Sequence, residues 1–407
     1  MRIEAPRGTL DVLPSEQPAR DAVIRAAESA AADYGYRRIV TPTFEDTDLF
    51  ARTSGAGSDV VQKEMYTFED RSGRSLTLRP EATAPIARAY LEHGLHREPQ
   101  PVKFFLIGPM FRYSAPQRGR YREFWQIDFE AMGSEDPAVD AELIQLFAEI
   151  ARRARVRYTR LIVNSIGDRE CRPAYVETLR SFLREREDAL DADTRRKAET
   201  SPLRVFDAKK PDVQRVLAGA PTIGDSLCEA CRAHFETVAA LLDAYGIAYE
   251  VVPTLVRGLD YYTRTVFEFV NDDLEAAQST ICAGGRYDYL IEEIGGPPTP
   301  GVGWAAGVER MVLSREGGQP EDGIDVFFAF ADPARRVKVV PLLAELRRSG
   351  RAADTDYAGR SLKGQLTQAD RLGARSVVIV RADGATLRRR GHPDVEAATI
   401  EDLRALL

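Results

Sequence analysis

GRYREFWQIDFEAMG, residues 119–133, is the stretch on which the fold depends. If it forms a strand, successive side chains point to opposite faces of a sheet. One face is then mostly apolar, and the other is a row of hydrogen-bonding groups that suits the floor of a polar site. An ordinary antiparallel strand with one hydrated face has the same pattern. The apolar face carries Tyr121, Glu123, Trp125, Ile127 and Phe129, and the polar face carries Arg120, Arg122, Phe124, Gln126, Asp128 and Glu130.

The segments on either side predict a mixed α and β unit. Residues 102–133 predict two strands around the polar loop SAPQRG, and residues 16–34 have the spacing and composition of a helix. Strands return over 248–270. The segment GVGWAAGVERMVL, residues 301–313, predicts a buried helix.

A chain of 407 residues is long enough for two or three domains. Residues 168–245 are highly charged with helical spacing, which indicates a helical insertion. SREGGQPEDG is rich in glycine, proline and charge, as linkers are. After it, strands and helices alternate in a small βαβ-type pattern with a parallel core. The predicted boundaries are 1–167 and 246–313 for the two parts of one domain, 168–245 for the insertion, 314–323 for the linker and 324–407 for the last domain.

Charge and cysteine content limit the partners and the compartment. The net charge is −7, yet residues 324–407 carry 15 Lys and Arg against 11 Asp and Glu, so their net +4 leaves −11 on the rest. A basic tail on an acidic body is consistent with contact to a polyanion, although chance produces the same imbalance. The sequence has no apolar run of membrane-spanning length and no signal-peptide pattern at its start, and four cysteines make no disulfide framework. We therefore expect a cytoplasmic protein with no membrane partner.

Arginines recur beside the predicted strands, and the usual nucleotide loops are missing. Arg112 ends an apolar strand, Arg257 begins LVRGLDYYTRTVFEF (255–269), and Arg310 interrupts an apolar segment. They are either partners in structural ion pairs or a clamp for phosphates, which a guanidinium binds as a planar fork. The sequence lacks G-x-x-x-x-G-K-[ST], and GVGWAAG has the wrong spacing for a dinucleotide fingerprint. A phosphate site must then rest on arginine side chains and a metal ion.

Histidine and cysteine chemistry is not favoured. None of the four histidines lies in a candidate site segment, which disfavours a Ser-His-Asp or metal–histidine mechanism. Cys228 and Cys231 form one C-x-x-C, but a zinc site needs a second pair nearby and His234 alone does not complete one. We assign no metal ligand from the sequence and leave open whether this pair binds a metal.

Several motifs together resemble histidyl-tRNA synthetase, a class II aminoacyl-tRNA synthetase. PRGTLDVLP resembles its opening signature, GYRRIVTPTFED resembles class II motif 1, MFRYSAPQRGRYREFWQ motif 2 and GVGWAAGVERMVL motif 3. LVRGLDYYTRTVFEF and CAGGRYDYL resemble two signatures of the histidine enzyme, and GRSLKGQLTQADRLGARSVVIV resembles its anticodon-binding domain. The matches follow the family's order over nearly the whole chain.

The resemblance implies an α+β fold: a class II antiparallel catalytic sheet with flanking helices, a helical insertion and a C-terminal α/β anticodon-binding domain. It also implies a cytoplasmic homodimer. The implied reaction uses ATP and Mg²⁺ to activate L-histidine and transfers it to the 3′ end of histidine tRNA, releasing AMP and diphosphate.

The family's motifs also imply roles for individual residues. Arg112 and Arg257 match the catalytic arginines at the α-phosphate and the substrate carboxylate, and Arg310 matches the one that binds the far phosphates of ATP. Gln117 and Arg120 match the contact with the tRNA acceptor end, and no residue matches a metal ligand.

Seven positions match the family's histidine pocket. The resemblance implies that the first group of these positions holds the amino group of histidine and the second contacts its imidazole ring. A site that pairs both ring nitrogens would exclude apolar isosteres. The first group is Glu81, Ala82, Thr83 and Gln126, and the second is Glu130, Tyr261 and Tyr262.

The chain departs from the common bacterial pattern in motif 2, where Ser114-Ala115-Pro116-Gln117 replaces Glu-Arg-Pro-Gln. We therefore expect weaker dependence on the extra 5′ guanosine of histidine tRNA. Three alternatives remain: a catalytically silent regulatory subunit of ATP phosphoribosyltransferase, a synthetase-like enzyme with another substrate, and a general RNA-binding module.

Overall fold

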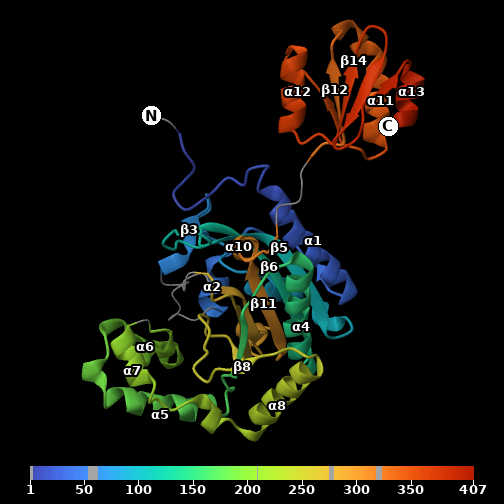
Figure 1. Ribbon diagram of the computed structural model, residues 1–407. Helices are drawn as coiled ribbons and strands as arrows, with labels where there is room; N and C mark the ends of the chain where they lie inside the picture. Colours follow the sequence, from blue (N-terminus) through green and yellow to red (C-terminus); the bar gives the residue numbers. More distant parts are fainter. Residues whose placement is uncertain (1–2, 54–62, 209, 275–278, 318–322) are drawn as a thin grey trace. The chain divides into compact units, whose positions relative to one another are not determined.

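The computed structural model describes residues 3–53, 63–208, 210–274, 279–317 and 323–407. It divides into two compact units, 1–317 and 318–407, which are described separately (Figure 1). No helix within the described ranges is long and apolar enough to cross a membrane.

The first unit is built on an eight-stranded sheet in the order β1-β5-β6-β11-β10-β9-β7-β8. Its central pairs are antiparallel, and only the two edge pairs, β1–β5 and β7–β8, are parallel. The antiparallel sheet implied by the resemblance is thus confirmed. Its strands are β1 (Arg37–Arg38), β5 (Val102–Phe111), β6 (Glu123–Met132), β7 (Arg160–Ser165), β8 (Glu250–Val251), β9 (Thr263–Val270), β10 (Thr280–Arg286) and β11 (Gly301–Gly307).

The predicted buried helix over 301–313 is wrong in its first half. Residues 301–307 form β11, and only Val308–Leu313 form a helix, α10. Val302, Trp304 and Ala306 alternate into the core, which is the period of a strand and not of a helix. The glycines between them are poor helix formers, and Gly303 has no room for a side chain: a Cβ there would lie 1.7 Å from Oε2 of Glu130.

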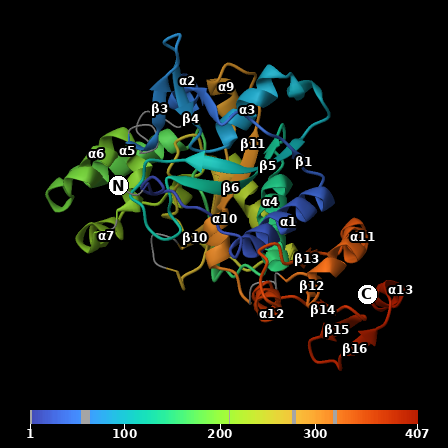
Figure 2. The same ribbon diagram turned by 90° about the horizontal axis from the view of Figure 1, so that it is seen from above.

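Two cores hold this sheet, one on each face. On one face, α1 (Gln17–Asp33), α4 (Pro137–Ala154) and α8 (Glu229–Ala244) cover the apolar side of the sheet, with α4 over β11 and α8 over β7 and β9 (Figure 1). Figure 2 shows α1 and α4 from above. On the other, α3 (Thr83–Glu92) and α9 (Leu290–Glu293) pack beside the tyrosines of 261–262. The polar face of β6 therefore opens on the second side, as its alternation predicts.

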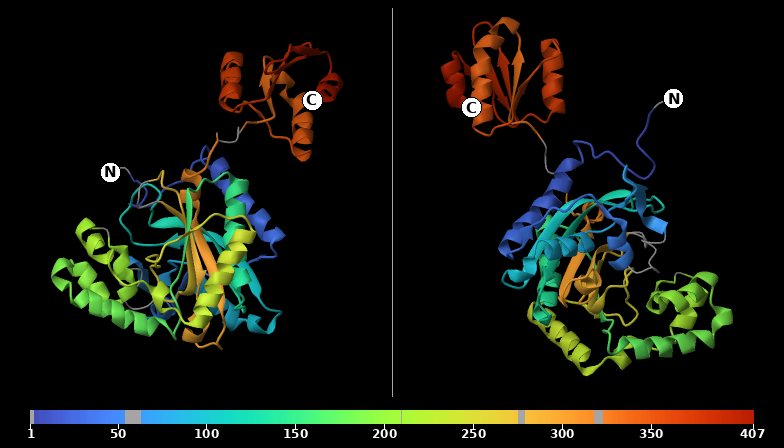
Figure 3. Two further views of the ribbon diagram at one scale, coloured as in Figure 1. Left: turned by 60° about the horizontal axis from the view of Figure 1, so that its bottom comes forward. Right: turned by 180° about the vertical axis from the view of Figure 1, so that it is seen from behind.

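Two smaller parts complete the unit. A three-stranded sheet, β2 (Phe44–Asp46), β4 (Ser75–Leu78) and β3 (Tyr66–Glu69), carries α2 (Thr47–Thr53). The insertion forms a helical lobe beside the main sheet with a hydrophobic core of its own (Figure 3). Its helices are α5 (Arg172–Arg184), α6 (Ala192–Thr200) and α7 (Pro211–Leu217), whereas α8 packs on α4.

The second unit is a five-stranded sheet in the order β13-β12-β14-β15-β16 with helices around it. β12 pairs in parallel with both neighbours, which confirms the predicted parallel core, while β15 and β16 add antiparallel strands. The strands are β12 (Val326–Phe330), β13 (Ala353–Thr355), β14 (Ser376–Val380), β15 (Ala385–Arg389) and β16 (Val395–Ala397). The helices are α11 (Arg336–Arg348), α12 (Leu362–Arg371) and α13 (Ile400–Leu406).

A fully buried ion pair ties α4 to β10. Arg286 and Asp140 are both 0% exposed, Arg286 Nε donates to Asp140 at 3.2 Å, and His234 Nε2 lies 3.2 Å from the same carboxylate. Burial opposes the charge on Asp140, but Arg286 and His234 outweigh it and lower its pKa to about 2. The lowered pKa stabilises the fold above pH 4, and this contribution is lost as the pH falls through about 2.

Asp140→Asn should lower the free energy of unfolding by about 3 kcal/mol, because it leaves the buried Arg286 guanidinium with one carboxylate, that of Asp288 at 3.1 Å, where it had two. Denaturant titration of the variant measures this. Asp243→Asn, at an exposed acid on α8, is the control and should change stability by less than about 0.5 kcal/mol. Equal stability of the two variants would contradict the prediction.

Candidate active site

A cavity of about 360 Å³ opens on the polar face of β6, between the ends of β5, β9, β10 and β11. Most of the residues singled out in the sequence meet in it. Glu130 lies against two of its lining residues, while Ala82 and Gln117 are outside the lining. The predicted residues that line the cavity are Glu81, Thr83, Arg112, Arg120, Gln126, Arg257, Tyr261, Tyr262 and Arg310.

Two arginines at one end of the cavity are held by carbonyl oxygens. Arg112 Nε donates to Pro80 O at 2.7 Å, and the guanidinium carbon lies 5.3 Å from the centre of the Phe124 ring. Arg310 donates from Nη1 to Thr280 O at 2.8 Å and from Nε to Gly119 O at 3.2 Å. Neither arginine forms an ion pair within the described part of the chain. Carbonyls orient these groups without neutralising them, so the positive charge remains available to an anion.

The electrostatics of Arg310 agree with that interpretation. Burial lowers its pKa to about 10, and the nearby Arg112 and Arg120 act in the same direction. Concentrated positive charge in a buried site is unfavourable when the site is empty, and a polyphosphate would relieve it.

Arg257 is buried differently, because it is paired. Its guanidinium contacts the carboxylate of Glu268, and Thr280 Oγ1 donates to that carboxylate at 2.8 Å. Burial alone would lower the pKa of Arg257, but Glu268 raises it overall. The Arg257 guanidinium carbon also lies 5.8 Å from the ring centre of Tyr262. Arg257 thus connects the arginine end of the cavity to the tyrosines.

Carboxyl groups gather in the part of the site next to α3. Glu81 accepts hydrogen bonds from the backbone N–H groups of Thr83, at 2.8 Å, and Ala84, at 3.0 Å, so it is fixed by the first turn of α3. Thr83 Oγ1 donates to Glu130 at 2.6 Å, and Tyr287 donates to the same carboxyl. Ala82 is buried in the core beneath and presents no polar side chain.

Burial dominates the titration of these groups. It raises the pKa of Glu81, raises that of Glu130 to about 8, and raises that of Asp128 well above its ordinary range. Both carboxyl oxygens of Asp128 are buried and have no hydrogen-bond partner among the described residues. An arrangement of this kind would be stabilised by a ligand that brings N–H donors.

Tyrosine rings form part of the wall of the cavity. The rings of Tyr261 and Tyr262 are 4.6 Å apart, and those of Tyr261 and Tyr287 are 5.9 Å apart. Tyrosine combines a flat apolar surface with a polar tip, which suits a small ring that also carries N–H groups.

The loop between β5 and β6 closes into a short turn. Gln117 and Arg120 exchange backbone hydrogen bonds of 3.0 and 2.9 Å, and the Arg120 side chain pairs with Glu64 at 3.0 Å. Arg120 faces the cavity. Gln117 does not, and its buried Nε2 has no partner among the described residues.

Sequence reasoning missed Glu268, Thr280 and Tyr287. Glu268 could have been found, because a single charge inside VFEFV on a strand that leads from Arg257 needs a partner. Tyr287 lies within the quoted CAGGRYDYL signature, but nothing in its spacing indicated a bond to Glu130.

Glu130→Gln should change how stability depends on pH. A carboxyl whose pKa rises from 4.5 to about 8 on folding favours the folded state below pH 4.5, and that contribution is lost as the pH rises through about 8. Glu130→Gln removes this ionisable group. The free energy of unfolding of the variant minus that of the parent should therefore be larger at pH 8.5 than at pH 5, by on the order of 3 kcal/mol. Urea titrations of both proteins at the two pH values measure this difference. The same difference in free energy of unfolding at both pH values would contradict the prediction.

Known proteins share both the sequence and the fold that frame this cavity. The family model for histidyl-tRNA synthetase matches residues 8–311. The chain is 46% identical over 389 residues to a histidine–tRNA ligase of Rubrobacter xylanophilus, across 93% of this chain and 92% of that one. A crystal structure of apo S. aureus histidyl-tRNA synthetase, 35% identical, superposes with a TM-score of 0.82 over 100% of this chain and 99% of that one.

A second solved structure bears on the regulatory alternative. It is an ATP phosphoribosyltransferase regulatory subunit/histidyl-tRNA synthetase from Bacillus halodurans, 22% identical, with a TM-score of 0.68 over 94% of this chain and 100% of that one. A likeness at this identity shows a shared fold alone.

Proposed function

The chain belongs to the histidyl-tRNA synthetase family, and on that premise we propose how its cavity performs the reaction of a histidine–tRNA ligase. The enzyme activates L-histidine with ATP and transfers the histidyl group to the 3′ end of histidine tRNA. One observation carries the proposal for the site: a single cavity brings together Arg112 and Arg310, which have no ion-pair partner among the described residues, and buried carboxyls.

Activation requires alignment more than acid–base catalysis. A carboxylate oxygen of histidine attacks the α-phosphorus of ATP, an O–P bond forms, and the bond to the β-phosphate oxygen breaks to release diphosphate. The carboxylate is already ionised at pH 7, so no base is needed. We propose that Arg112 and Arg257 bind the α-phosphate and the carboxylate as charge builds there, and that Arg310 binds the far phosphates.

We propose that histidine lies with its amino group toward Glu81, Thr83 and Gln126. Ala82 serves only through its backbone. The imidazole ring of the substrate then meets Glu130 between Tyr261 and Tyr262. A buried carboxyl makes the ring N–H groups necessary for binding, because an apolar analogue would leave it unpaired.

Transfer and assembly extend the proposal. A ribose hydroxyl of the tRNA attacks the histidyl carbonyl and AMP leaves, with Gln117 and Arg120 contacting the acceptor end. The unit 318–407, whose described part has a net basic charge, binds the anticodon arm. Glu268, which lines the cavity beside Arg257, would hold Mg²⁺ bound with ATP, because its carboxylate oxygens are of the type this ion binds, and the ion would neutralise phosphate charge. We also propose a homodimer in the cytoplasm.

The test is ATP–diphosphate exchange with each of the twenty amino acids, without tRNA. We expect exchange with histidine alone. Exchange with a different amino acid would indicate another substrate. No exchange from folded, dimeric protein would favour a silent regulatory subunit, and salt-sensitive binding of any RNA without exchange would favour an RNA-binding module.

The loop sequence Ser114-Ala115-Pro116-Gln117 leads to a separate prediction about tRNA. Charging of histidine tRNA transcripts with and without the extra 5′ guanosine should differ by less than about tenfold, since Ala115 replaces the arginine of the common bacterial pattern and cannot bind a phosphate. Steady-state aminoacylation measures the ratio. A loss of several hundredfold without the guanosine would contradict this prediction.

A further inference from the structure

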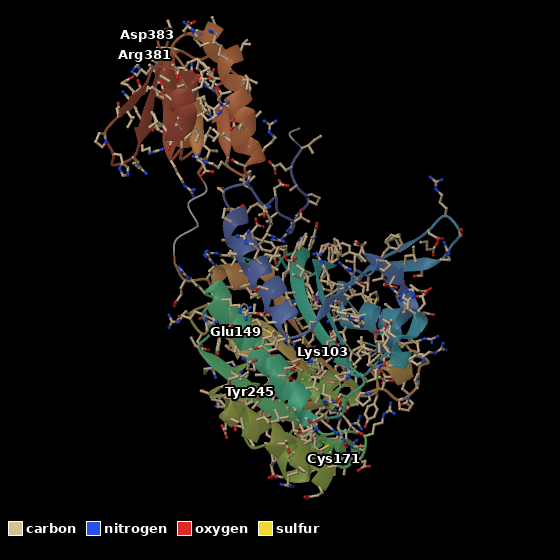
Figure 4. The ribbon with its side chains drawn as sticks, turned by 90° about the vertical axis from the view of Figure 1, so that its right-hand side faces the viewer. Lys103, Glu149, Cys171, Tyr245, Arg381 and Asp383 are labelled. Carbon is tan, nitrogen blue, oxygen red and sulfur yellow. The ribbon has the colours of Figure 1, made fainter. Side chains whose placement is uncertain are left out.

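Four metal-binding side chains meet at the base of the insertion. They are Asp168 and Cys171, just before α5, and Cys228 and Cys231, at the start of α8. One sulfur or oxygen atom from each lies within 4.8 Å of all the others. Cys171 is labelled in Figure 4. The sequence showed only the C-x-x-C half, because its partners are 60 positions away.

We propose that these four residues bind one Zn²⁺ ion, with three thiolates and one carboxylate as ligands. The distances between the ligand atoms are near those of a tetrahedral site. Cys171 Sγ lies 3.9 Å from Cys231 Sγ, and Asp168 Oδ1 lies 3.6 Å from Cys171 Sγ and 4.0 Å from Cys228 Sγ. Zinc bonds of about 2.3 Å to sulfur and about 2.0 Å to oxygen require separations of about 3.8 and 3.5 Å. The three distances above exceed these by at most about 0.5 Å, and no pair of the four atoms is more than 4.8 Å apart.

The local backbone supports the same assignment. Asp168-x-x-Cys171 and Cys228-x-x-Cys231 are two short chelating loops of the spacing found in structural zinc sites. The backbone N–H of Asp168 points to Cys171 Sγ at 3.4 Å, which stabilises a thiolate. Gly167, at φ +65°, makes the tight turn, and a Cβ there would lie 2.6 Å from that sulfur.

Cations also surround the cluster. Three thiolates and a carboxylate around Zn²⁺ carry a net charge of −2. Arg264 Nη2 lies 3.6 Å from Asp168 Oδ2, and Arg172, next to Cys171, donates to Gly167 O at 2.9 Å. The competing interpretation is a set of neutral thiols that donate weak hydrogen bonds to Asp168, which needs no ion and predicts no metal.

The site joins the two ends of the insertion directly behind the histidine pocket. Arg172 also donates to Tyr262 O at 2.6 Å, and the backbone N–H of Arg264 donates to Gly167 O at 2.7 Å. A metal that fixes residues 167–172 therefore also fixes the backbone of the stretch that carries Tyr262. Asp168, Cys171, Cys228 and Cys231 are positioning residues in this scheme.

Metal content tests the site without reference to activity. Untagged protein from zinc-supplemented cells, desalted over a chelating resin, should contain one zinc per chain by elemental analysis. Cys171→Ser and Cys228→Ser should lose it. Cys282→Ser, at the remaining cysteine, is the matched control and should retain it. Asp168→Cys should retain it as well, because a fourth thiolate is an equally good ligand.

Cobalt(II) supplies a second readout. The folded parent and Cys282→Ser, refilled with Co²⁺, should show thiolate-to-cobalt charge-transfer absorption, which Cys171→Ser should lack. Parent protein without zinc and without this absorption, or zinc that survives the double variant Cys171→Ser/Cys228→Ser, would overturn the proposal. A Cys171–Cys231 disulfide, seen as two missing thiols on titration of metal-free parent, would overturn it too.

The effect on catalysis rests on the proposed function. Zinc removal should raise the KM for histidine in the exchange assay by about tenfold or more and change the KM for ATP less than twofold. If the protein contains one zinc per chain but its KM values do not change when zinc is removed, the metal site stands and its positioning role is overturned. Absent exchange in zinc-loaded parent would count against the proposed function alone.

Discussion

We expect Arg112→Gln to lower the rate of histidine-dependent ATP–diphosphate exchange by about 10²–10³-fold, because it removes a charged donor aimed at the reacting phosphate. The guanidinium lies at the end of β5, is held by Pro80 O and has no carboxylate partner among the described residues. Its removal therefore leaves no buried anion unpaired, and the fold should survive. The loss should appear in kcat with a smaller change in the KM for histidine, because the contact strengthens as charge develops.

Two further variants make this result interpretable. Arg112→Lys keeps the charge but not the planar fork, so its exchange rate should stay below about a tenth of the parent rate. Arg74→Gln, at an arginine whose side chain is 73% exposed in the β3–β4 hairpin, is the matched control and should exchange at the parent rate. If Arg112→Gln retained more than a tenth of the parent rate, Arg112 would not be the group that binds the reacting phosphate.

We expect Glu130→Gln to raise the KM for histidine by about 10²-fold, because a bound ring N–H favours the carboxylate form of Glu130 and an amide of the same shape is a weaker acceptor. Glutamine can still accept from Thr83 and pair with Tyr287, so the cavity should keep its form. The KM for ATP should change little, since Glu130 makes its side-chain hydrogen bonds with Thr83 and Tyr287 and none with Arg112 or Arg310.

The control for this variant lies on the same strand. Glu123→Gln changes an exposed carboxylate at the start of β6 and should leave both KM values unchanged. If the KM of Glu130→Gln for histidine lay within threefold of the parent value, another residue would bind the imidazole ring of the substrate. Asp128 would then be the next carboxyl to test.

The strand predicted within 119–133, which the structure forms over Glu123–Met132 after a turn at 117–120, illustrates what can be predicted from the sequence. Its alternation places Ile127 and Phe129 in the core and Gln126 and Asp128 in the cavity wall, as the structure has them. Side-chain periodicity is a local property, and burial on one face is enough to reveal it.

The errors and omissions come from contacts between distant segments. Residues 301–307 were predicted as helix because the apolar run in GVGWAAG is compatible with either period, and only pairing with β6 and β10 decides it. Glu81 is bound to the first turn of α3, a contact that the sequence does not reveal. The cluster at Asp168 could not be found either, because chain spacing does not tell which loops meet.

The missing side chain at Gly303 has an evolutionary consequence. Every base change in a glycine codon that replaces the residue adds a Cβ atom, and here that atom would overlap the carboxyl of Glu130. Gly284, across the β10–β11 pair, is equally confined, because a Cβ there would lie 2.3 Å from Gly303 O. Neither position has a neutral neighbour one mutation away, so drift cannot reshape this wall of the cavity one residue at a time. A change at Glu130 would remove one of these overlaps, but the backbone oxygen of Phe129, 2.6 Å from the same Cβ, would still confine position 303 to glycine.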